Sequence, residues 1–106
     1  MKRFRKQNKC GFKWGFHDSN NKIILPPVYD YAENFSEGLA KVILNKKHGY
    51  IDKKGNMVIP PAYDGAGNFH EGFASVMVKL NEKYRFIFID KKGNQYSEDQ
   101  IQKLSL

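Results

Sequence analysis

Three histidines are the residues of this chain whose type is most often associated with metal chemistry. They are His17, His48 and His70. Zinc ligands usually come from closely spaced pairs of His or Cys, and no two of these histidines are near neighbours in the sequence. The chain has one cysteine, Cys10, which excludes an internal disulfide and a multi-cysteine zinc site. We therefore predict no metal site and no cofactor.

Carboxylates are the second group that could do chemistry, because a pair of acids can act as general acid and base. They recur at corresponding places along the chain, as Asp18/Asp52/Asp90, Asp30/Asp64 and Glu37/Glu71. An acid that returns once in each structural unit is more simply explained as a turn-forming residue. The sequence also contains no phosphate-binding glycine loop, nucleophile elbow or Ser/His/Asp set. We predict that the protein is not an enzyme and has no catalytic residues.

A tandem repeat positions all of these residues. Lys13–Val42 aligns without a gap with Lys47–Val76, an offset of 34 residues, and a truncated third copy starts at Arg85 with an offset of 38. Tetratricopeptide helices share the period of 34. However, each full copy contains Pro-Pro, which removes two backbone donors and forces the preceding residue out of the helical region. A helical repeat is therefore excluded.

The same residues predict an all-β fold, an antiparallel β-meander of about two and a half copies with seven or eight strands. Leu39–Leu44 and Phe73–Leu80 are rich in strand formers, with alternate residues expected to face the core. His48–Ile51, Arg85–Ile89 and the short segments Ile23–Leu25 and Met57–Ile59 are the other expected strands.

Turn-forming residues separate these strands. Asp-Lys-Lys-Gly-Asn at 52–56 and 90–94 predicts a turn in which the glycine takes a positive φ, and Asn21 holds that place in the first copy. Glu37-Gly38 and Glu71-Gly72 mark the other reversal.

This pattern resembles the tryptophan-glycine (WG) β-repeat family. The resemblance rests on Lys13-Trp14-Gly15-Phe16, His48–Asp52, the Pro-Pro-x-Tyr-Asp segments and Phe-x-Glu-Gly-(Leu/Phe)-Ala at 35–40 and 69–74. It implies a bacterial β-repeat protein with no established catalytic residues. The chain departs from the pattern where Trp becomes His48 and Phe86, and where the following Gly becomes Ile87.

Aromatic residues also recur, and two interpretations remain open for them. They form either a repeating aromatic core or an exposed ladder that stacks on sugars, bases or side chains. Trp14, Tyr29 and Tyr63 are the candidates for the ladder, because their polar edges tolerate partial exposure.

Positive charge is concentrated at the N-terminus. The net charge is +7, and residues 1–13 hold six basic residues and no acid, including Arg3, Arg5 and Lys6. We interpret this segment as a basic arm on a nearly neutral body. Stacked copies would also align the turn residues Lys53, Lys54, Lys91 and Lys92 in one row, which is either an anion-binding surface or ordinary solubilising charge.

We accordingly divide the chain into a basic N-terminal arm or first edge (1–12), a repeat domain (13–46, 47–84 and 85–96) and a C-terminal cap (97–106). We expect the cap to form a short helix. No apolar stretch indicates a signal peptide or membrane span, so we expect a cytoplasmic protein. Uncovered sheet edges make a homodimer possible.

Three functions are compatible with the sequence. The first is a non-catalytic module that binds a protein partner through its repeat surface. The second is binding of nucleic acid or a ribonucleoprotein through the basic arm and the lysine row. The third is recognition of a glycan or cell-wall polymer by exposed aromatic residues.

Overall fold

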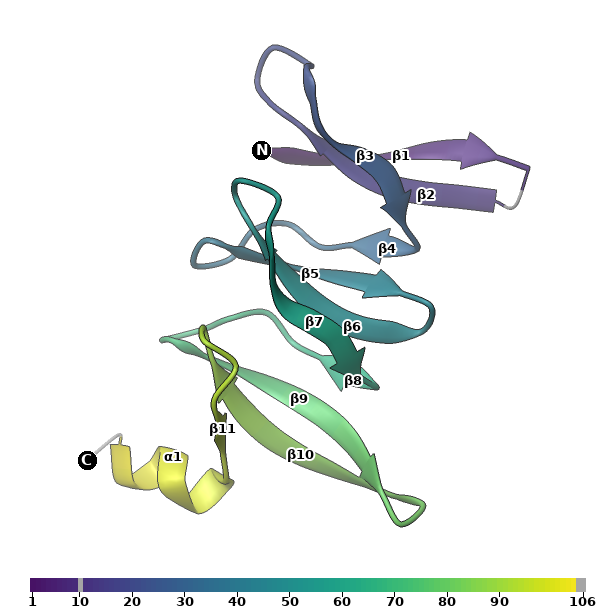
Figure 1. The fold of residues 1–106 in the computed structure, drawn as a ribbon. Coiled ribbons are helices and arrows are strands. Elements are labelled where there is room, and N and C mark those ends of the chain that lie inside the picture. The colour runs from purple at the N-terminus through teal and green to yellow at the C-terminus, as the bar shows by residue number, and fades with distance from the viewer. Residues whose placement is uncertain (10, 105–106) are drawn as a thin grey trace.

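Three small antiparallel sheets and a C-terminal helix make up the protein in a computed structural model, which describes residues 1–9 and 11–104 (Figure 1). The elements are, in the first sheet, β1 (Lys2–Asn8), β2 (Gly11–His17) and β3 (Ile23–Tyr29); in the second, β4 (Tyr31–Ala32), β5 (Leu39–Leu44), β6 (Lys47–Asp52) and β7 (Met57–Tyr63); in the third, β8 (Gly65–Ala66), β9 (Phe73–Leu80), β10 (Lys83–Asp90) and β11 (Gln95–Tyr96); and then α1 (Glu98–Leu104). The all-β antiparallel prediction is confirmed. The described residues form eleven strands rather than seven or eight, because the sheets also contain β1 and the short edge strands β4, β8 and β11.

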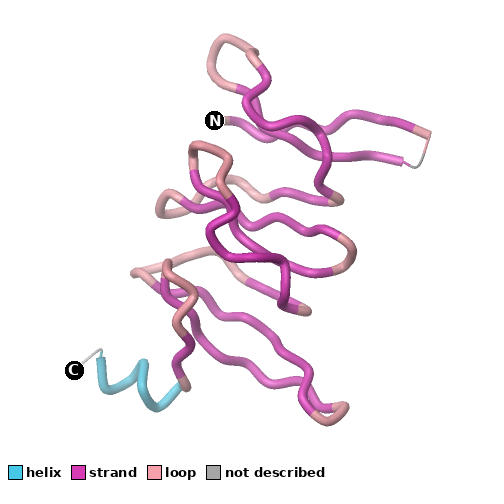
Figure 2. Tube along the Cα trace, in the orientation of Figure 1, coloured by secondary structure: helices cyan, strands magenta, loops and turns pink. Residues whose placement is uncertain are grey.

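The sheets follow one another along the long axis of a thin molecule of 43 × 32 × 15 Å (Figure 2). We call them the first, second and third levels. Each level contains one long two-stranded hairpin, which we call its central hairpin, and the strand after this hairpin forms one edge of the sheet. In the first level β1 of the hairpin is itself the other edge. The short strands β4 and β8 form the opposite edge of the second and third levels.

The N-terminal segment is an edge strand, which agrees with the first edge of the prediction and not with a separate arm. β1 pairs with β2 along its whole length, from Lys2 opposite His17 to Asn8 opposite Gly11. This register makes β1 the counterpart of β5 and β9, since all three are the first strand of a central hairpin. The boundary drawn at residue 12 therefore cuts through a hairpin. The prediction for Cys10 lies outside the described residues.

Two-residue turns close the central hairpins of the second and third levels. Asn45 and Lys46 have φ of 52° and 68°, and Asn81 and Glu82 have 50° and 65°. Paired left-handed residues form the type I′ turn that suits the twist of a hairpin. In the third level the hairpin is two residue pairs longer, because Val78 opposite Arg85 is followed by two more pairs before the turn. The extra four residues of the third copy are therefore located at a hairpin tip.

The turns predicted from glycine and asparagine are confirmed. Asn21, Gly55 and Gly93 take φ of 61°, 89° and 86° in the turns that follow the central hairpins. The preceding aspartate accepts the backbone amides of two turn residues in each case, as Asp52 does from Lys54 and Asn56 at 2.9 Å. Asp18, Asp52 and Asp90 are thus structural residues of three equivalent turns.

The strand containing each Pro-Pro pair is longer than predicted. β3 and β7 continue through the prolines to Tyr29 and Tyr63. Both are edge strands, where the missing proline N–H groups break no ladder on the outer side. In β6, Tyr50 lies opposite Ile59 and His48 lies opposite Tyr63. A step of two residues along β6 therefore matches a step of four along β7, and the prolines lie in the resulting bulge.

A glycine lies under each bulge. A Cβ atom on Gly15 would lie 2.4 Å from the Leu25 carbonyl oxygen, and one on Gly49 would lie 2.6 Å from that of Ile59. Backbone cannot yield at such distances as a flexible side chain can. The glycine of the Trp-Gly and His-Gly pairs is thus fixed by the Pro-Pro strand that crosses it.

Two apolar clusters fill the spaces between the levels. The cluster between the first and second levels contains Phe16, Tyr29, Ala32, Ala40, Val42 and Ile51. The cluster between the second and third contains Leu39, Tyr50, Ile59, Tyr63, Phe69, Ala74, Val76 and Ile89. Ala40 and Val42, with Ala74 and Val76, are buried as the strand alternation predicted.

The predicted C-terminal helix is present as α1. Ser97 caps it, since its Oγ accepts the Gln100 amide at 3.3 Å and its own amide donates to Gln100 Oε1 at 2.8 Å. This is a reciprocal capping box. Glu98 and Asp99 occupy the first turn, where negative charge suits the helix dipole.

We predict that Gly49→Ala destabilises the protein by about 2–3 kcal/mol, because the new methyl group would overlap backbone atoms of Ile59 and Pro61. Gly67→Ala is the matched control, since its Cβ would have an ordinary contact of 3.7 Å. Urea denaturation at equilibrium measures the difference. Equal midpoints for the two variants would contradict this account of the glycine.

Candidate interaction site

A basic side chain links each of the first two levels to the next one. Arg3 Nη1 donates to the carbonyl oxygen of Ala32 at 2.9 Å, and Lys41 Nζ donates to that of Ala66 at 2.9 Å. The register shows that these contacts are equivalent, because Arg3 lies opposite Phe16 and Lys41 opposite Tyr50. In the third level the residue in this place is Ser75, opposite Phe88.

A pair of aromatic rings forms the centre of each contact between levels. The Phe16 and Phe35 ring centroids are 5.0 Å apart, and those of Tyr50 and Phe69 are 4.8 Å apart. As a result Phe16 and Tyr50 are both 0% exposed. Their counterpart Phe88 has no such aromatic neighbour among the described residues, and it is half-buried.

The Glu-Gly turns also stack from level to level. Glu37 Oε1 accepts the Gly72 amide at 2.8 Å and lies 3.5 Å from Lys91 Nζ. The amide hydrogen bond from Gly72 is the main cause of the lowered pKa of Glu37. Beside it, Ser36 Oγ donates to the Phe69 carbonyl at 2.8 Å.

A pocket of about 550 Å³ lies where the third level would meet a further one. Its lining includes His70, Glu71, Ser75 and Phe88, which correspond to Ser36, Glu37, Lys41 and Tyr50 of the second level. Ile101 of α1 closes part of it. The groups that hold the next level elsewhere in the molecule are therefore gathered here around an open space.

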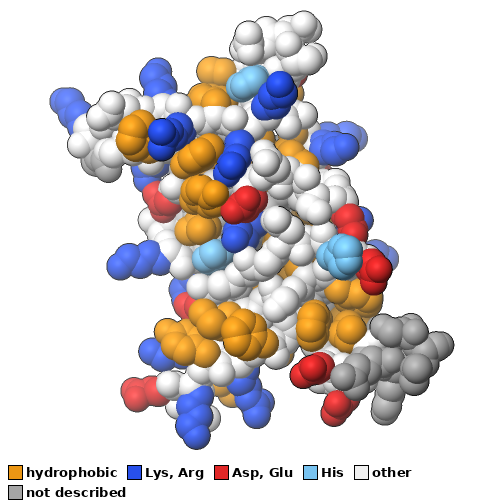
Figure 3. Space-filling view, turned by 180° about the vertical axis from the view of Figure 1, so that it is seen from behind, with side chains coloured by type: hydrophobic (Ala, Val, Ile, Leu, Met, Phe, Trp, Pro, Cys, Tyr) orange, Lys and Arg blue, Asp and Glu red, His pale blue; other side chains and the backbone are white. Residues whose placement is uncertain are grey.

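Aromatic side chains continue from this pocket along the outer face of the third level. We define the outer face as Phe73, Ser75 and Met77 of β9 with Tyr84, Phe86 and Phe88 of β10, which lie opposite one another in register or alternate along one strand. Tyr84 is 56% exposed and Phe86 71%. Figure 3 shows hydrophobic side chains gathered over the β9–β10 hairpin in the lower part of the molecule.

The third level also lacks most of its edge strand. β11 pairs only with Phe88 and Ile89, whereas β7 extends along β6 as far as His48. In place of Pro-Pro the third copy has Glu98-Asp99, which begin α1. Without a bulge crossing it, the glycine position tolerates a side chain, and Ile87 packs on the inner core.

A family model described as WG containing repeat matches residues 14–47 and 49–84. The chain belongs to the WG repeat family. No curated protein and no solved structure matches it.

Trp14, the WG tryptophan, is half-buried and not free on the surface. Its ring meets Tyr31 edge-on at 5.3 Å, and the Arg3 guanidinium lies 4.9 Å from its centroid. Trp14 and Arg3, two predicted binding residues, are thus brought together at the contact between the first two levels.

Tyr29 and Tyr63 do not form an exposed ladder. Each is 8% exposed, and each belongs to one of the two core clusters. Of the two interpretations left open, the core one holds for these tyrosines, because the strand runs on through the prolines and places each tyrosine opposite the WG position, Trp14 or His48. The described structure leaves these rings little area for stacking on a ligand.

Basic residues are dispersed over two regions. Arg5 and Lys6 are exposed on β1, where the Arg5 guanidinium lies 4.4 Å from the Phe12 ring. Lys53, Lys54, Lys91 and Lys92 are exposed in two equivalent turns. Each of these turns packs its glycine region on the preceding level, Gly55 near Leu25 and Gly93 near Ile59. Lys91 is engaged by Glu37.

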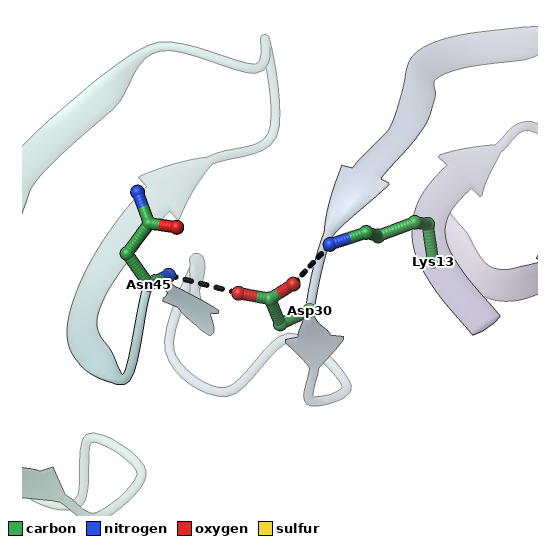
Figure 4. Close-up of polar contacts among 3 residues, drawn as sticks. All are labelled: Lys13, Asp30 and Asn45. Carbon is green, nitrogen blue, oxygen red and sulfur yellow. Dashed lines mark hydrogen bonds and ion pairs between the residues drawn. The ribbon is translucent and has the colours of Figure 1, made fainter. Parts of the chain in front are cut away.

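The Tyr-Asp aspartates are structural as well. Asp30 lies between Lys13 Nζ and the amide of Asn45, which it accepts at 2.8 Å (Figure 4). Asp64 pairs with Lys47 in the corresponding place. The hydrogen bond with lysine is the main cause of a lowered pKa in both carboxyls.

Neither a metal cluster nor a membrane-spanning helix occurs in the part of the chain that the structure describes. No three His, Cys, Asp or Glu side chains there are grouped so that they could hold a metal ion. No helix there is long and apolar enough to cross a membrane.

Sequence reasoning missed the pocket and the outer face. The available signal was the joint loss of glycine at Ile87 and of Pro-Pro at Glu98-Asp99. Together these changes indicate that the third hairpin lacks its full edge strand.

We predict a loss of stability on mild acidification that depends on His48. Its Nδ1 is buried without a hydrogen-bond partner, and burial, with the nearby Lys41 charge, lowers its pKa. The unfolded chain, with a histidine pKa of about 6.5, then binds the proton more readily than the folded one. Stability should therefore fall as the pH drops through about 6.5.

His48→Phe, which installs the residue of the third WG repeat, should reduce this loss. The measurement is the urea midpoint at pH 7.5 and at pH 5.5, a window above the range where most carboxylates titrate. His70→Gln is the control, because the His70 side chain is 87% exposed. An identical pH dependence in wild type and His48→Phe would refute the assignment.

Proposed function

We propose that this WG repeat domain is a non-catalytic interaction module that binds a protein partner through the outer face of its third level. The observation that carries the proposal is the exposure of Tyr84 and Phe86 beside the pocket at Phe88. Contiguous apolar surface of this kind is typical of interaction sites. Aromatic residues are also enriched among the side chains that dominate binding energy.

The equivalent positions in the other levels support this choice. Phe86 corresponds to Trp14, whose ring meets Tyr31 of the second level, and to His48, which is half-buried. A protein surface is the natural cover for such a face, since it supplies both apolar area and backbone groups. The unpaired part of β10, from Lys83 to Ile87, adds an edge that can accept a further strand.

We predict that Phe86→Ala weakens partner binding about tenfold or more, because burying a phenylalanine side chain contributes about 1.5–3 kcal/mol. The measurement is quantitative pull-down of partner proteins with the immobilised chain from an extract of the organism that encodes it. Val28→Ala, at a half-exposed apolar side chain on β3 of the first level, is the matched control. Binding that is equally strong in both variants would exclude this face.

A second function, binding of nucleic acid or a ribonucleoprotein, is favoured by the charge of the first hairpin. Lys2, Arg5, Lys6 and Lys9 are exposed on or beside β1. Figure 3 shows basic side chains around this hairpin in its upper part. The lysine-bearing turns add charge, although Lys91 is paired with Glu37.

This alternative predicts a gel shift with single-stranded or duplex nucleic acid that weakens steeply with salt. Replacing Lys2, Lys6 and Lys9 together by Gln should abolish the shift, and replacing Lys22, Lys46 and Lys83 by Gln is the control of equal charge, since these lysines are exposed and lie outside the proposed surface. Absence of any shift at low salt would eliminate this function. Glycan recognition has less support, because Tyr29 and Tyr63 are buried.

A further inference from the structure

The pocket beside Phe88 repeats one half of a contact that the molecule makes twice. In both internal contacts, an aromatic residue of the central hairpin packs against a phenylalanine from the following segment, Phe35 on Phe16 and Phe69 on Tyr50. The phenylalanine begins a Phe-x-Glu-Gly turn in each case. The third level supplies the first half of this contact at Phe88, and the second half is absent from the described residues.

Polar groups around the pocket have the same correspondence. Glu71 takes the place of Glu37, which accepts a glycine amide from the following turn. His70 takes the place of Ser36, which donates to the carbonyl of the following phenylalanine. Both side chains are exposed at the third level, 86% for Glu71 and 87% for His70. They are therefore accessible for the same contacts with an incoming turn.

Ser75 accounts for the size of the pocket. It stands where Arg3 and Lys41 reach across to an alanine carbonyl of the next level. A serine side chain is much shorter than either, so space remains above it. Ile101 closes one side, at the sequence position that corresponds to Tyr63 by the offset of 38.

We propose that this pocket binds a phenylalanine side chain presented by an Asn-Phe-x-Glu-Gly segment of another protein chain, which thereby adds a further level to the stack. This proposal rests on the proposed function and names the chemistry of its partner. Among the described residues both Phe-x-Glu-Gly segments are engaged, because Phe69 is buried in the core and Phe35 packs on Phe16. The occupant that we propose is therefore a segment of another chain.

The test uses a synthetic peptide with the sequence of residues 31–40, Tyr-Ala-Glu-Asn-Phe-Ser-Glu-Gly-Leu-Ala. It is titrated into the full ¹⁵N-labelled chain and followed by heteronuclear NMR. We expect saturable shifts of the His70, Ser75 and Phe88 amides with millimolar affinity, because a short peptide loses its conformational freedom on binding. The same peptide with Ala in place of Phe is the matched control and should bind at least about tenfold more weakly.

Two protein variants distinguish specific binding of the peptide in the pocket from non-specific binding elsewhere on the protein. Ser75→Lys restores the residue of the second level, and its ammonium group should bond the peptide's first alanine carbonyl and tighten binding about three- to tenfold. Ser75→Trp fills the pocket and should abolish binding while the chain remains folded, as judged by its amide spectrum. Ser75 is exposed, so neither change disturbs the core.

Absence of amide shifts at about 5 mM peptide, or equal binding of the Phe and Ala peptides, would overturn the proposal. So would peptide binding that survives Ser75→Trp. If partner capture depends on Phe86 but the peptide does not bind, the Phe-x-Glu-Gly occupant is wrong and the docking face stands. If capture does not depend on Phe86, the docking face itself is wrong.

Discussion

The close passage of a proline-containing edge strand over a glycine is the constraint on which each complete level depends. Backbone atoms of the strand lie within 3 Å of where a Cβ of Gly15 or Gly49 would be. Proline is compatible with this strand because a bulged edge strand uses few of its backbone N–H groups as donors. The bulge in turn brings Tyr29 or Tyr63 back into register opposite the WG position. The glycine, the prolines and the tyrosine thus depend on one another and form one structural motif.

The third level shows the structure that forms when this glycine–proline motif is absent. Ile87 replaces the glycine, Glu98-Asp99 replace the prolines, and the chain turns into a capped helix at Ser97. The edge strand shrinks to two residues. One change without the other would leave either a clash or an unfilled space, so the substitutions belong together. Their shared consequence is that β10 has an edge-strand partner only at Phe88 and Ile89 among the described residues.

Much of the fold could be predicted because it depends on local chemistry. Left-handed residues at Gly55, Gly93 and Asn21 and the alternation of β5 and β9 are properties of short segments. β1 was missed because its seven residues include four cations and have no apolar alternation, and only the register shows its kinship with β5. The lengths of β3 and β7 were underestimated because proline was taken as the end of a strand rather than as an edge residue.

The exposure of aromatic residues could not be predicted, because it depends on contacts between levels. Tyr63 and Phe86 are both aromatic residues in repeat copies, yet one is buried in a core cluster and the other is open. What separates them is whether another unit follows the hairpin in space, and no short segment of sequence contains that information. The two ends of the stack consequently differ in character. The first level ends in a cationic strand with Arg3 already engaged by the second level, whereas the third ends in aromatic rings around an open pocket. The third level thus presents Tyr84 and Phe86 beside a pocket lined by Phe88, and this combination makes the C-terminal end the favoured place for the proposed protein partner.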